Sequence, residues 1–272
     1  MEYLRNQGVT LVVDDFHYIP PTVRFILAQQ FKEAARSGLS IVVISVSHRA
    51  DDAIKANPDL RGRVATVEIP YWEPEELHQI ADKGFPILKM KVDSAVIERM
   101  VTESIRSPQL MQALCLQFCR QIKCESTLDT PKSFSLDSAE MGLLLRDTST
   151  LTNCRSTYEI LVTGPRVRGQ DRKEYLFHDG ARGDVYEAIL KALAVEEPIL
   201  TVGYDALKKR IESVCSGEAP RGVSITEALQ QMNKAIEEKL STDRVFDWND
   251  NYVNLPDPYF LYYLRWASLP KL

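Results

Sequence analysis

The sequence predicts an α/β protein, with a partial parallel sheet at the start of the chain and helical regions after it. Two apolar runs, at residues 9–13 and 41–46, flank a stretch with helical periodicity and so predict the sheet. Helical patterns return after residue 71, and a short hairpin follows near the end of the chain. With 272 residues, the chain has room for one large domain or two modest ones.

The composition is that of an ordinary globular protein, with 44% hydrophobic and 26% charged residues. A net charge of −5 argues against a protein that coats nucleic acid or an anionic membrane by bulk charge. No apolar run reaches the roughly 18 residues of a membrane helix, and the first ten residues lack a secretion signal. We therefore expect a cytoplasmic protein with no membrane partner.

The five cysteines are scattered along the chain, and reduced thiols are expected. Cys115 and Cys119 lie one helical turn apart and, with Cys124, form a candidate metal site. The C-x2-C spacing of structural zinc sites is absent, however. Packing of these small side chains in a helical core is the favoured interpretation.

The first apolar run, the helix and the second apolar run are predicted to form a right-handed parallel crossover. Within the helix, Thr22 is the expected N-cap and Gly38 the expected C-terminal stop. Strands that are apolar throughout suit a sheet covered on both faces. Residues 65–69 are a third candidate strand.

Polar side chains follow both predicted strands, where ligands bind in sheets of this kind. Asp14 and Asp15 end the first strand, and Ser47, His48 and Arg49 end the second. Paired carboxylates can hold hydrated Mg²⁺ and orient a water, and an arginine nearby can neutralise a phosphate. The alternative is a turn with two aspartates and a solvated arginine.

These strands resemble those of a known ATPase family. LVVDDFHYI resembles the Walker B strand of P-loop ATPases, in particular the signal-transduction ATPases with numerous domains (STAND), and IVVISVSHR resembles their sensor-1 strand. The resemblance implies that Asp14 lies in the Mg²⁺ shell, that Asp15 polarises water and that Arg49 faces the γ-phosphate. It also implies that Arg63, or the nearby Arg61, stands where related AAA+ proteins carry an arginine finger.

The resemblance extends into a predicted helical lid at residues 71–122. There, the segment that ends at Pro108 resembles the Gly-x-Pro segment of STAND lids. In those lids the proline packs near the adenine. Ser107 or Arg106 stands where glycine is usual. Gln109 follows, where AAA+ lids often carry the sensor-2 arginine, and its identity favours the STAND class.

The sequence contains no G-x-x-x-x-G-K-[ST] phosphate loop, since none of its 12 glycines precedes a lysine. That loop supplies the amide cradle and the lysine that hold a triphosphate. We therefore expect a truncated or split protein, or a degenerate pseudo-ATPase, that binds ATP weakly alone. The expected partner is the missing N-terminal P-loop segment or a subunit that carries it.

Residues 123–182 are rich in small polar residues and are predicted to form an irregular linker. Residues 183–272 predict three helices, a hairpin and an aromatic closing helix, which is the winged-helix layout. Ser224 is the expected N-cap of the third helix, with Glu227 completing a capping box. About 90 residues are expected to suffice for an independent domain.

Charge argues against DNA binding by this predicted winged helix. Residues 183–272 hold 10 basic and 14 acidic residues, a net charge of −4. Because contacts between basic side chains and phosphates dominate DNA affinity, this region is poorly charged for DNA binding. A DNA-binding face would have to segregate its basic residues, as in the set Lys208, Lys209, Arg210 and Arg221.

The predicted architecture is thus a partial P-loop ATPase core at residues 1–70, a helical lid at 71–122, a linker at 123–182 and a winged helix at 183–272. The resemblance implies part of an ATP-binding STAND/AAA+-like ATPase that acts as a nucleotide-dependent switch, with ATP and Mg²⁺ as cofactors and homo-oligomers as one expected assembly. The alternatives are a winged-helix DNA-binding regulator and a non-catalytic protein-interaction module. Whether this chain is itself an enzyme stays open at this point.

Overall fold

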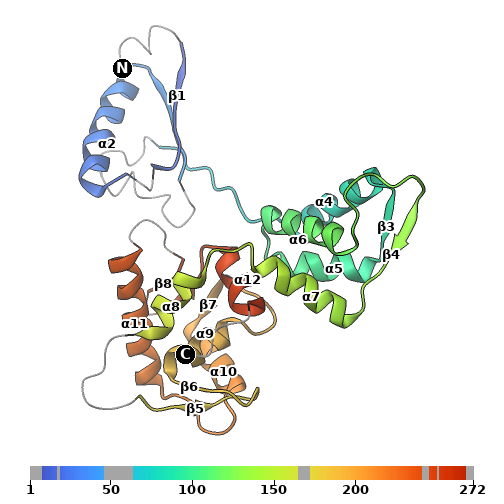
Figure 1. The fold of residues 1–272 in the computed structure, drawn as a ribbon. Coiled ribbons are helices and arrows are strands. Elements are labelled where there is room, and N and C mark those ends of the chain that lie inside the picture. Colours follow the sequence, from blue (N-terminus) through green and yellow to red (C-terminus); the bar gives the residue numbers. More distant parts are fainter. Residues whose placement is uncertain are drawn as a thin grey trace. The chain divides into compact units, whose positions relative to one another are not determined.

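The computed structural model describes residues 8–16, 19–45, 64–164, 172–240, 245–249 and 251–267. The chain divides into two compact units, Met1–Pro70 and Tyr71–Leu272 (Figure 1). Each unit is described by itself. Together they contain the mixture of helices and small sheets that the sequence predicts.

In the first unit, two parallel strands are connected through one helix, as the apolar pattern predicts. The elements are β1 (Thr10–Val13), α2 (Pro21–Arg36) and β2 (Ser40–Val43). The strands pair in register over all four residues of each.

The ends of α2 follow from proline and glycine chemistry. The helix begins after Pro20 with Pro21 as its first residue, so the prediction that Thr22 is the N-cap was wrong. Proline suits this position because its fixed φ is helical and its missing N–H is not needed there. At the other end, Gly38 has φ +92° and the Leu39 amide donates to the Ala34 carbonyl oxygen (3.0 Å), which is a Schellman motif.

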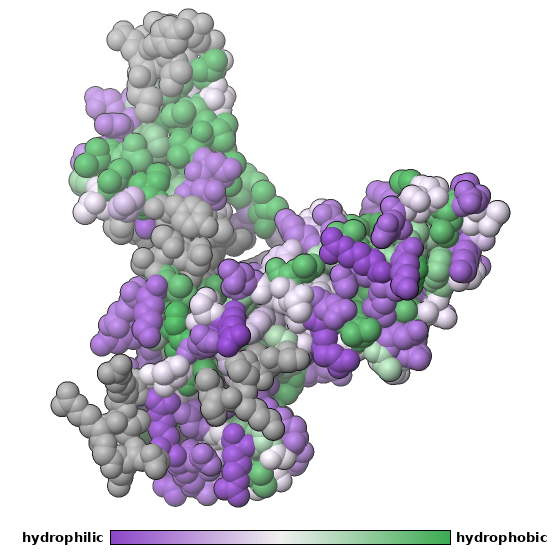
Figure 2. All heavy atoms as spheres, in the orientation of Figure 1, coloured by the Kyte–Doolittle hydropathy of each residue, from purple (hydrophilic) through white to green (hydrophobic). Residues whose placement is uncertain are grey.

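Side chains of the two strands alternate between half-buried and exposed positions. The core of the unit holds Phe16 and Phe31, whose ring centroids are 6.2 Å apart. On the other face, Val12, Val42 and Ile44 are 55%, 46% and 44% exposed. Apolar side chains gather on the visible surface of this unit (Figure 2). Parallel sheets are usually covered on both faces, and the described residues cover only one.

The predicted third strand at residues 65–69 does not form in the part of the chain that the structure describes. Val67 and Ile69 are 84% and 80% exposed and no strand pairs with them. A strand needs hydrogen bonds to a neighbour as well as an apolar sequence, and the described residues supply no such neighbour.

The second unit is mainly helical. Its helices are α4 (Pro74–Ile87), α5 (Ser94–Glu103), α6 (Pro108–Gln121), α7 (Ser138–Ser149), α8 (Arg155–Thr163), α9 (Val185–Leu193), α10 (Tyr204–Val214), α11 (Gly222–Lys239) and α12 (Pro258–Trp266). Its strands are β3 (Met90–Val92), β4 (Lys132–Phe134), β5 (Tyr175–Leu176), β6 (Arg182–Gly183), β7 (Thr201–Gly203), β8 (Asp247–Trp248) and β9 (Tyr252–Asn254). β3 and β4 are parallel, β5 and β6 are antiparallel, and the third sheet has the antiparallel order β7-β9-β8.

Residues 123–182 are not an irregular linker, because they contain α7 and α8. The buried face of α7 carries Thr148 and Ser149 beside Leu144 and Leu145, and such a polar composition reads as a loop. The Thr148 hydroxyl donates to the Leu144 carbonyl oxygen (2.8 Å) and the Ser149 hydroxyl to that of Arg146 (2.6 Å). These local bonds satisfy the hydroxyls, so the helix can bury them.

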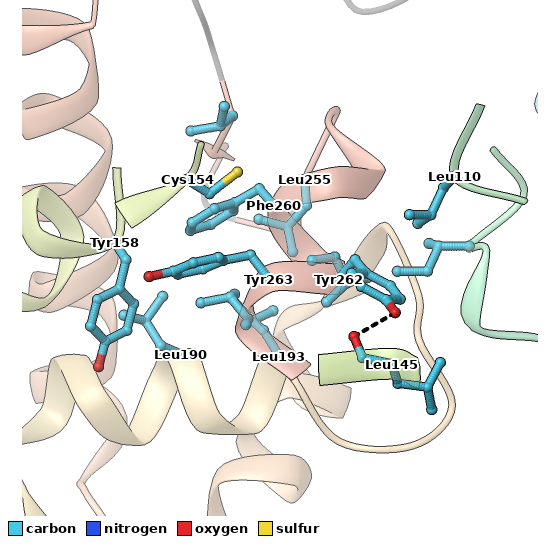
Figure 3. Packing of buried hydrophobic residues seen from close by; sticks show 14 of the residues in the cluster. Leu110, Leu145, Cys154, Tyr158, Leu190, Leu193, Leu255, Phe260, Tyr262 and Tyr263 are labelled. Atoms are coloured by element: carbon cyan, nitrogen blue, oxygen red, sulfur yellow. Dashed lines mark hydrogen bonds between the residues drawn. The ribbon is translucent and has the colours of Figure 1, made fainter. Parts of the chain in front are cut away.

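Residues 183–272 share one hydrophobic core with the segments before them, contrary to the expectation of an independent domain. The Tyr158 ring of α8 lies 6.3 Å from the Tyr263 ring of α12. Next to it along α12, Tyr262 donates a hydrogen bond from its hydroxyl to the Leu145 carbonyl oxygen of α7 (2.8 Å; Figure 3). Helices α7 and α8 therefore supply part of the core that the C-terminal helices need.

The third C-terminal helix, α11, begins at Gly222, so Ser224 is not its N-cap. The Tyr204 hydroxyl of α10 donates to the Gly222 carbonyl oxygen (3.0 Å), and the Ile225 amide donates to that of Arg221 (3.0 Å). The contact with Tyr204 thus fixes the first turn of α11 at Gly222, two residues before the predicted N-cap, Ser224.

Candidate functional site

Asp14 and Asp15 form a bulge at the carboxyl end of β1. The Ile44 amide donates to the Val13 carbonyl oxygen (2.9 Å), and the Phe16 amide donates to that of Ile44 (3.0 Å). In a regular parallel ladder the second donor would be Asp15, two residues after Val13. One extra residue is therefore inserted at this point, as in a β-bulge.

The backbone of Asp15 permits this bulge. Its φ is +52°, a left-handed value that aspartate adopts more readily than most residues. Its amide, released from the ladder, donates to Asp14 Oδ1 (2.8 Å). Phe16 then enters the core, while both carboxylates stay exposed. The two predicted site residues are thus brought together at the strand end.

Two exposed carboxylates at one strand end fit a hydrated Mg²⁺, which keeps several waters and takes only one or two protein carboxylates. The described residues contain no cluster of three or more His, Cys, Asp or Glu residues arranged to hold a metal. Among the described residues, only Asp15 is adjacent to Asp14 as a second carboxylate at this strand end.

The other residues predicted for this end of the sheet lie outside the described residues. They are Ser47, His48, Arg49, Arg61 and Arg63. Their predicted roles toward a phosphate stay predictions.

Pro108 is the first residue of α6 and follows a strained turn. Ile105 and Arg106 have φ values of +51° and +61°. Ser107 is the N-cap, and its hydroxyl accepts a hydrogen bond from the Leu110 amide (3.2 Å). Of the two residues considered for the usual glycine position, Arg106 has the left-handed backbone that glycine adopts at least cost.

Contacts with the chain before α4 hold Arg106 in this conformation. Its Nε donates to the Trp72 carbonyl oxygen (3.2 Å), and the Trp72 amide donates to the Arg106 carbonyl oxygen (3.2 Å). The guanidinium also forms an ion pair with Glu73, the N-cap of α4. Sequence reasoning missed Trp72 and Glu73, because nothing in the local pattern links them to a residue more than 30 positions later.

The aspartates and Pro108 belong to different units, and each part of the predicted site is described by itself. The carboxylate bulge lies in the first unit and the Arg106–Pro108 turn in the second.

The cysteines are all free thiols, and four of the five are buried. Burial raises the pKa of Cys115 to about 12, and the neighbouring Cys119 thiol contributes to the rise. Such a thiol is protonated near neutral pH and is a poor metal ligand or nucleophile. The core-packing interpretation therefore fits these residues.

Of the four basic residues proposed for a DNA-binding face, Lys208, Lys209 and Arg221 are exposed and Arg210 is half-buried. Arg210 donates to the Glu197 carbonyl oxygen (3.0 Å), and desolvation lowers its pKa. On α11, outside this set, Lys234 lies 3.8 Å from Glu238, and this pairing reduces the positive potential that phosphate would meet.

Comparison with known proteins identifies no family. No family model matches the chain, and no curated protein matches it. One similar solved structure is the crystal structure of Cdc6p from Pyrobaculum aerophilum, with 13% identity and a TM-score of 0.35. The similarity covers 95% of this chain and 65% of the Cdc6p chain, so this chain spans less than two thirds of that protein. It is too weak to establish a shared fold.

None of the helices in the described part of the chain combines the length and the apolar content that crossing a bilayer requires.

Proposed function

We propose that the chain is part of a STAND/AAA+-like P-loop ATPase and acts in a nucleotide-dependent switch. The observation that carries the proposal is the bulge at the end of β1, which exposes two adjacent carboxylates while Phe16 anchors the chain beneath them. The alternative, a solvated turn, does not require the ladder hydrogen bond to shift from Asp15 to Phe16. It also does not require a left-handed backbone at Asp15.

The proposed roles follow from charge and position. Asp14 holds a hydrated Mg²⁺, and Asp15 orients the water that attacks the γ-phosphate. Bound Mg²⁺ supplies charge neutralisation on the phosphate oxygens. Arg49 and Arg63 are proposed to face the phosphates, and Pro108 is proposed to pack near the adenine of ATP.

The turn at Arg106 supports the lid assignment independently. In a Gly-x-Pro segment the glycine stands two positions before the proline. Arg106 stands two positions before Pro108, and its backbone has the left-handed conformation that glycine adopts easily. The contacts of Arg106 with Glu73 and Trp72 hold this left-handed backbone and explain how an arginine can occupy the glycine position.

A further segment has to supply the phosphate cradle, because the sequence contains no phosphate loop. The exposed face formed by Val12, Val42 and Ile44 supports a partner that covers this face of the sheet. Residues 65–69, which pair with no strand among the described residues, support a partner that adds a strand. We propose that this partner is a phosphate-loop segment, either of a longer chain or of a second subunit.

For the C-terminal region we propose a winged helix that contacts protein. Helices α9, α10 and α11, the sheet order β7-β9-β8 and the β8–β9 hairpin support the winged-helix assignment. The net charge of −4 over residues 183–272 and the Lys234–Glu238 pair of α11 favour a protein contact over DNA. Binding of duplex DNA is the rival function, and titration decides between them.

The test uses the chain together with a phosphate-loop segment, supplied in the same polypeptide or as a second subunit. Asp15→Asn should slow ATP hydrolysis while ATP binding persists, and Asp14→Ala should weaken Mg²⁺-dependent binding. The exposed Asp82→Asn on α4 is the matched control and should change neither quantity. Unchanged hydrolysis in both site variants would refute the proposed roles.

A further inference from the structure

A buried ion pair connects two helices of the second unit that are far apart in the sequence. Glu103, the last residue of α5, is fully buried, and the Arg265 side chain of α12 is 4% exposed. Arg265 Nε donates to Glu103 Oε2 (3.0 Å) and Nη2 donates to Oε1 (2.9 Å). This bidentate geometry is the strong form of an arginine–carboxylate pair.

The remaining hydrogen-bonding groups of the pair are also used. Trp266 Nε1 donates to Glu103 Oε2 (2.7 Å), and Arg99 Nη2 lies 3.0 Å from Oε1. Arg265 Nη1 donates to the carbonyl oxygens of Ala194 (2.7 Å) and Val195 (2.8 Å), at the C-terminal end of α9. A cation is favoured there, because the helix dipole is negative at that end. We call Glu103, Arg265, Trp266 and Arg99 the buried charge cluster.

The rim of the cluster is more open. Arg99 is 35% exposed and also pairs with Glu196 (2.9 Å), which is 65% exposed. The Arg99 guanidinium lies 5.7 Å from the centre of the Trp266 ring. Water can therefore reach the outer pair, whereas Glu103 and Arg265 remain dry.

Movement of α5 away from α12 would expose these charges to solvent or leave them buried without a partner. Separating a buried pair leaves a charge in a poorly solvated site, which costs far more than breaking a surface pair. Arg265 would keep its bonds to the end of α9 but would lose the counter-charge of Glu103. The Tyr262–Leu145 bond also ties α12 to α7, which lies between α4–α6 and α9–α12 in the sequence.

From this geometry we infer that the buried charge cluster is a lock, which makes α4–α6 and α9–α12 move as one rigid body. The predicted lid and the predicted winged helix therefore do not rotate against each other while the cluster is intact. The inference concerns the motion of the second unit and holds whether or not the chain binds nucleotide.

Hydrogen–deuterium exchange of the full chain tests the lock. In the wild type, amides of α5, α9 and α12 should share one opening reaction, with the same dependence on low concentrations of urea. Glu103→Gln should accelerate exchange in all three helices together, by about 100-fold or more. Glu159→Gln, in the exposed Arg155–Glu159 pair, is the matched control and should leave these helices unchanged.

A milder variant covers the case in which Glu103→Gln does not fold. Trp266→Phe keeps an aromatic side chain, smaller than the indole, and removes one hydrogen bond to the Glu103 carboxylate. It should accelerate exchange in the same three helices by about 10-fold or more. Acceleration confined to α5, or to α12, would overturn the inference. So would separate opening reactions for α5 and α12 in the wild type.

Discussion

The Tyr262 hydroxyl donates a hydrogen bond to the carbonyl oxygen of Leu145, which lies 117 positions earlier in the sequence (2.8 Å). The tyrosine is fully buried between the C-terminal helices and α7 (Figure 3). This contact makes α7 part of the C-terminal core and leads to the first two predictions.

Tyr262→Phe should destabilise the chain by about 1 kcal/mol, because the Leu145 carbonyl loses a buried donor while the packing volume is kept. The melting temperature should fall by about 2–4 °C. The control is Tyr252→Phe, in a side chain that is 40% exposed, and thermal unfolding should show little change there. Equal melting temperatures for Tyr262→Phe and wild type would contradict the role of this bond.

Residues 183–272 expressed alone should not unfold cooperatively, whereas residues 71–272 should. The shorter segment lacks Leu145, Tyr158 and Glu103, so Tyr262 and Tyr263 lose packing partners and Arg265 loses its counter-charge. Urea denaturation followed by circular dichroism, with dye binding as a probe of exposed apolar surface, distinguishes the two cases. A sharp, two-state transition for the shorter segment would restore the independent domain.

Arg106→Gly should be less destabilising than Arg106→Ala, by about 1 kcal/mol. Both variants lose the contacts with Glu73 and Trp72, but only glycine relieves the left-handed backbone at φ +61°. The comparison is made by urea denaturation of the full chain. At an ordinary backbone position alanine is the more stabilising residue, so that order would refute the argument.

Ionisation of Cys154 should reduce stability at alkaline pH. Burial, with a contribution from Asp257, raises the pKa of this thiol from 9.0 to about 12. Below pH 9 the thiol is protonated in both the folded and the unfolded chain. Between about pH 9 and pH 12 it ionises only in the unfolded chain, so the free energy of unfolding falls as pH rises. Each unit of pH should remove about 1.4 kcal/mol through this group.

The Cys154 effect is isolated by comparing slopes. Other buried groups, such as Tyr158, titrate in the same range and act alike in wild type and in Cys154→Ala. The free energy of unfolding in reducing buffer should therefore fall less steeply with pH in the variant. The same slope in both proteins would show that Cys154 does not carry the effect.

The full chain should not bind duplex DNA with submicromolar affinity, even at low salt where phosphate contacts are strongest. Residues 183–272 carry 10 basic and 14 acidic residues, and Lys234 on α11 is paired with Glu238, so the net charge of this region opposes phosphate. Fluorescence titration with a labelled duplex measures the affinity. Tight, salt-sensitive binding that disappears in a Lys208→Ala, Lys209→Ala, Arg221→Ala variant would favour the DNA-binding alternative.

Sequence patterns predict well those elements whose signals are local. The crossover from β1 through α2 to β2, the stop at Gly38 and the helix start at Pro108 each depend on a few neighbouring residues. The hairpin of β8 and β9 is of the same kind, because its polar turn lies between two short apolar segments.

Other predictions were wrong or incomplete, each for its own physical reason. Helix α7 buries hydroxyls that bond within the helix, so its composition resembles a loop. Residues 65–69 have the composition of a strand but no neighbour among the described residues. At the candidate site the two aspartates are evident in the sequence, but the extra residue in the ladder depends on the pairing of Phe16 with Ile44.

The bidentate pair of Glu103 and Arg265 also constrains how the sequence can diverge. Replacing either residue alone leaves the other charge buried without a partner, so a protein with a single substitution loses folding stability. Among descendants of a common ancestor the two positions should therefore change together, either retained as a pair or both replaced by apolar residues. Trp266 is expected to follow them, since its indole N–H has a buried acceptor only while Glu103 is present.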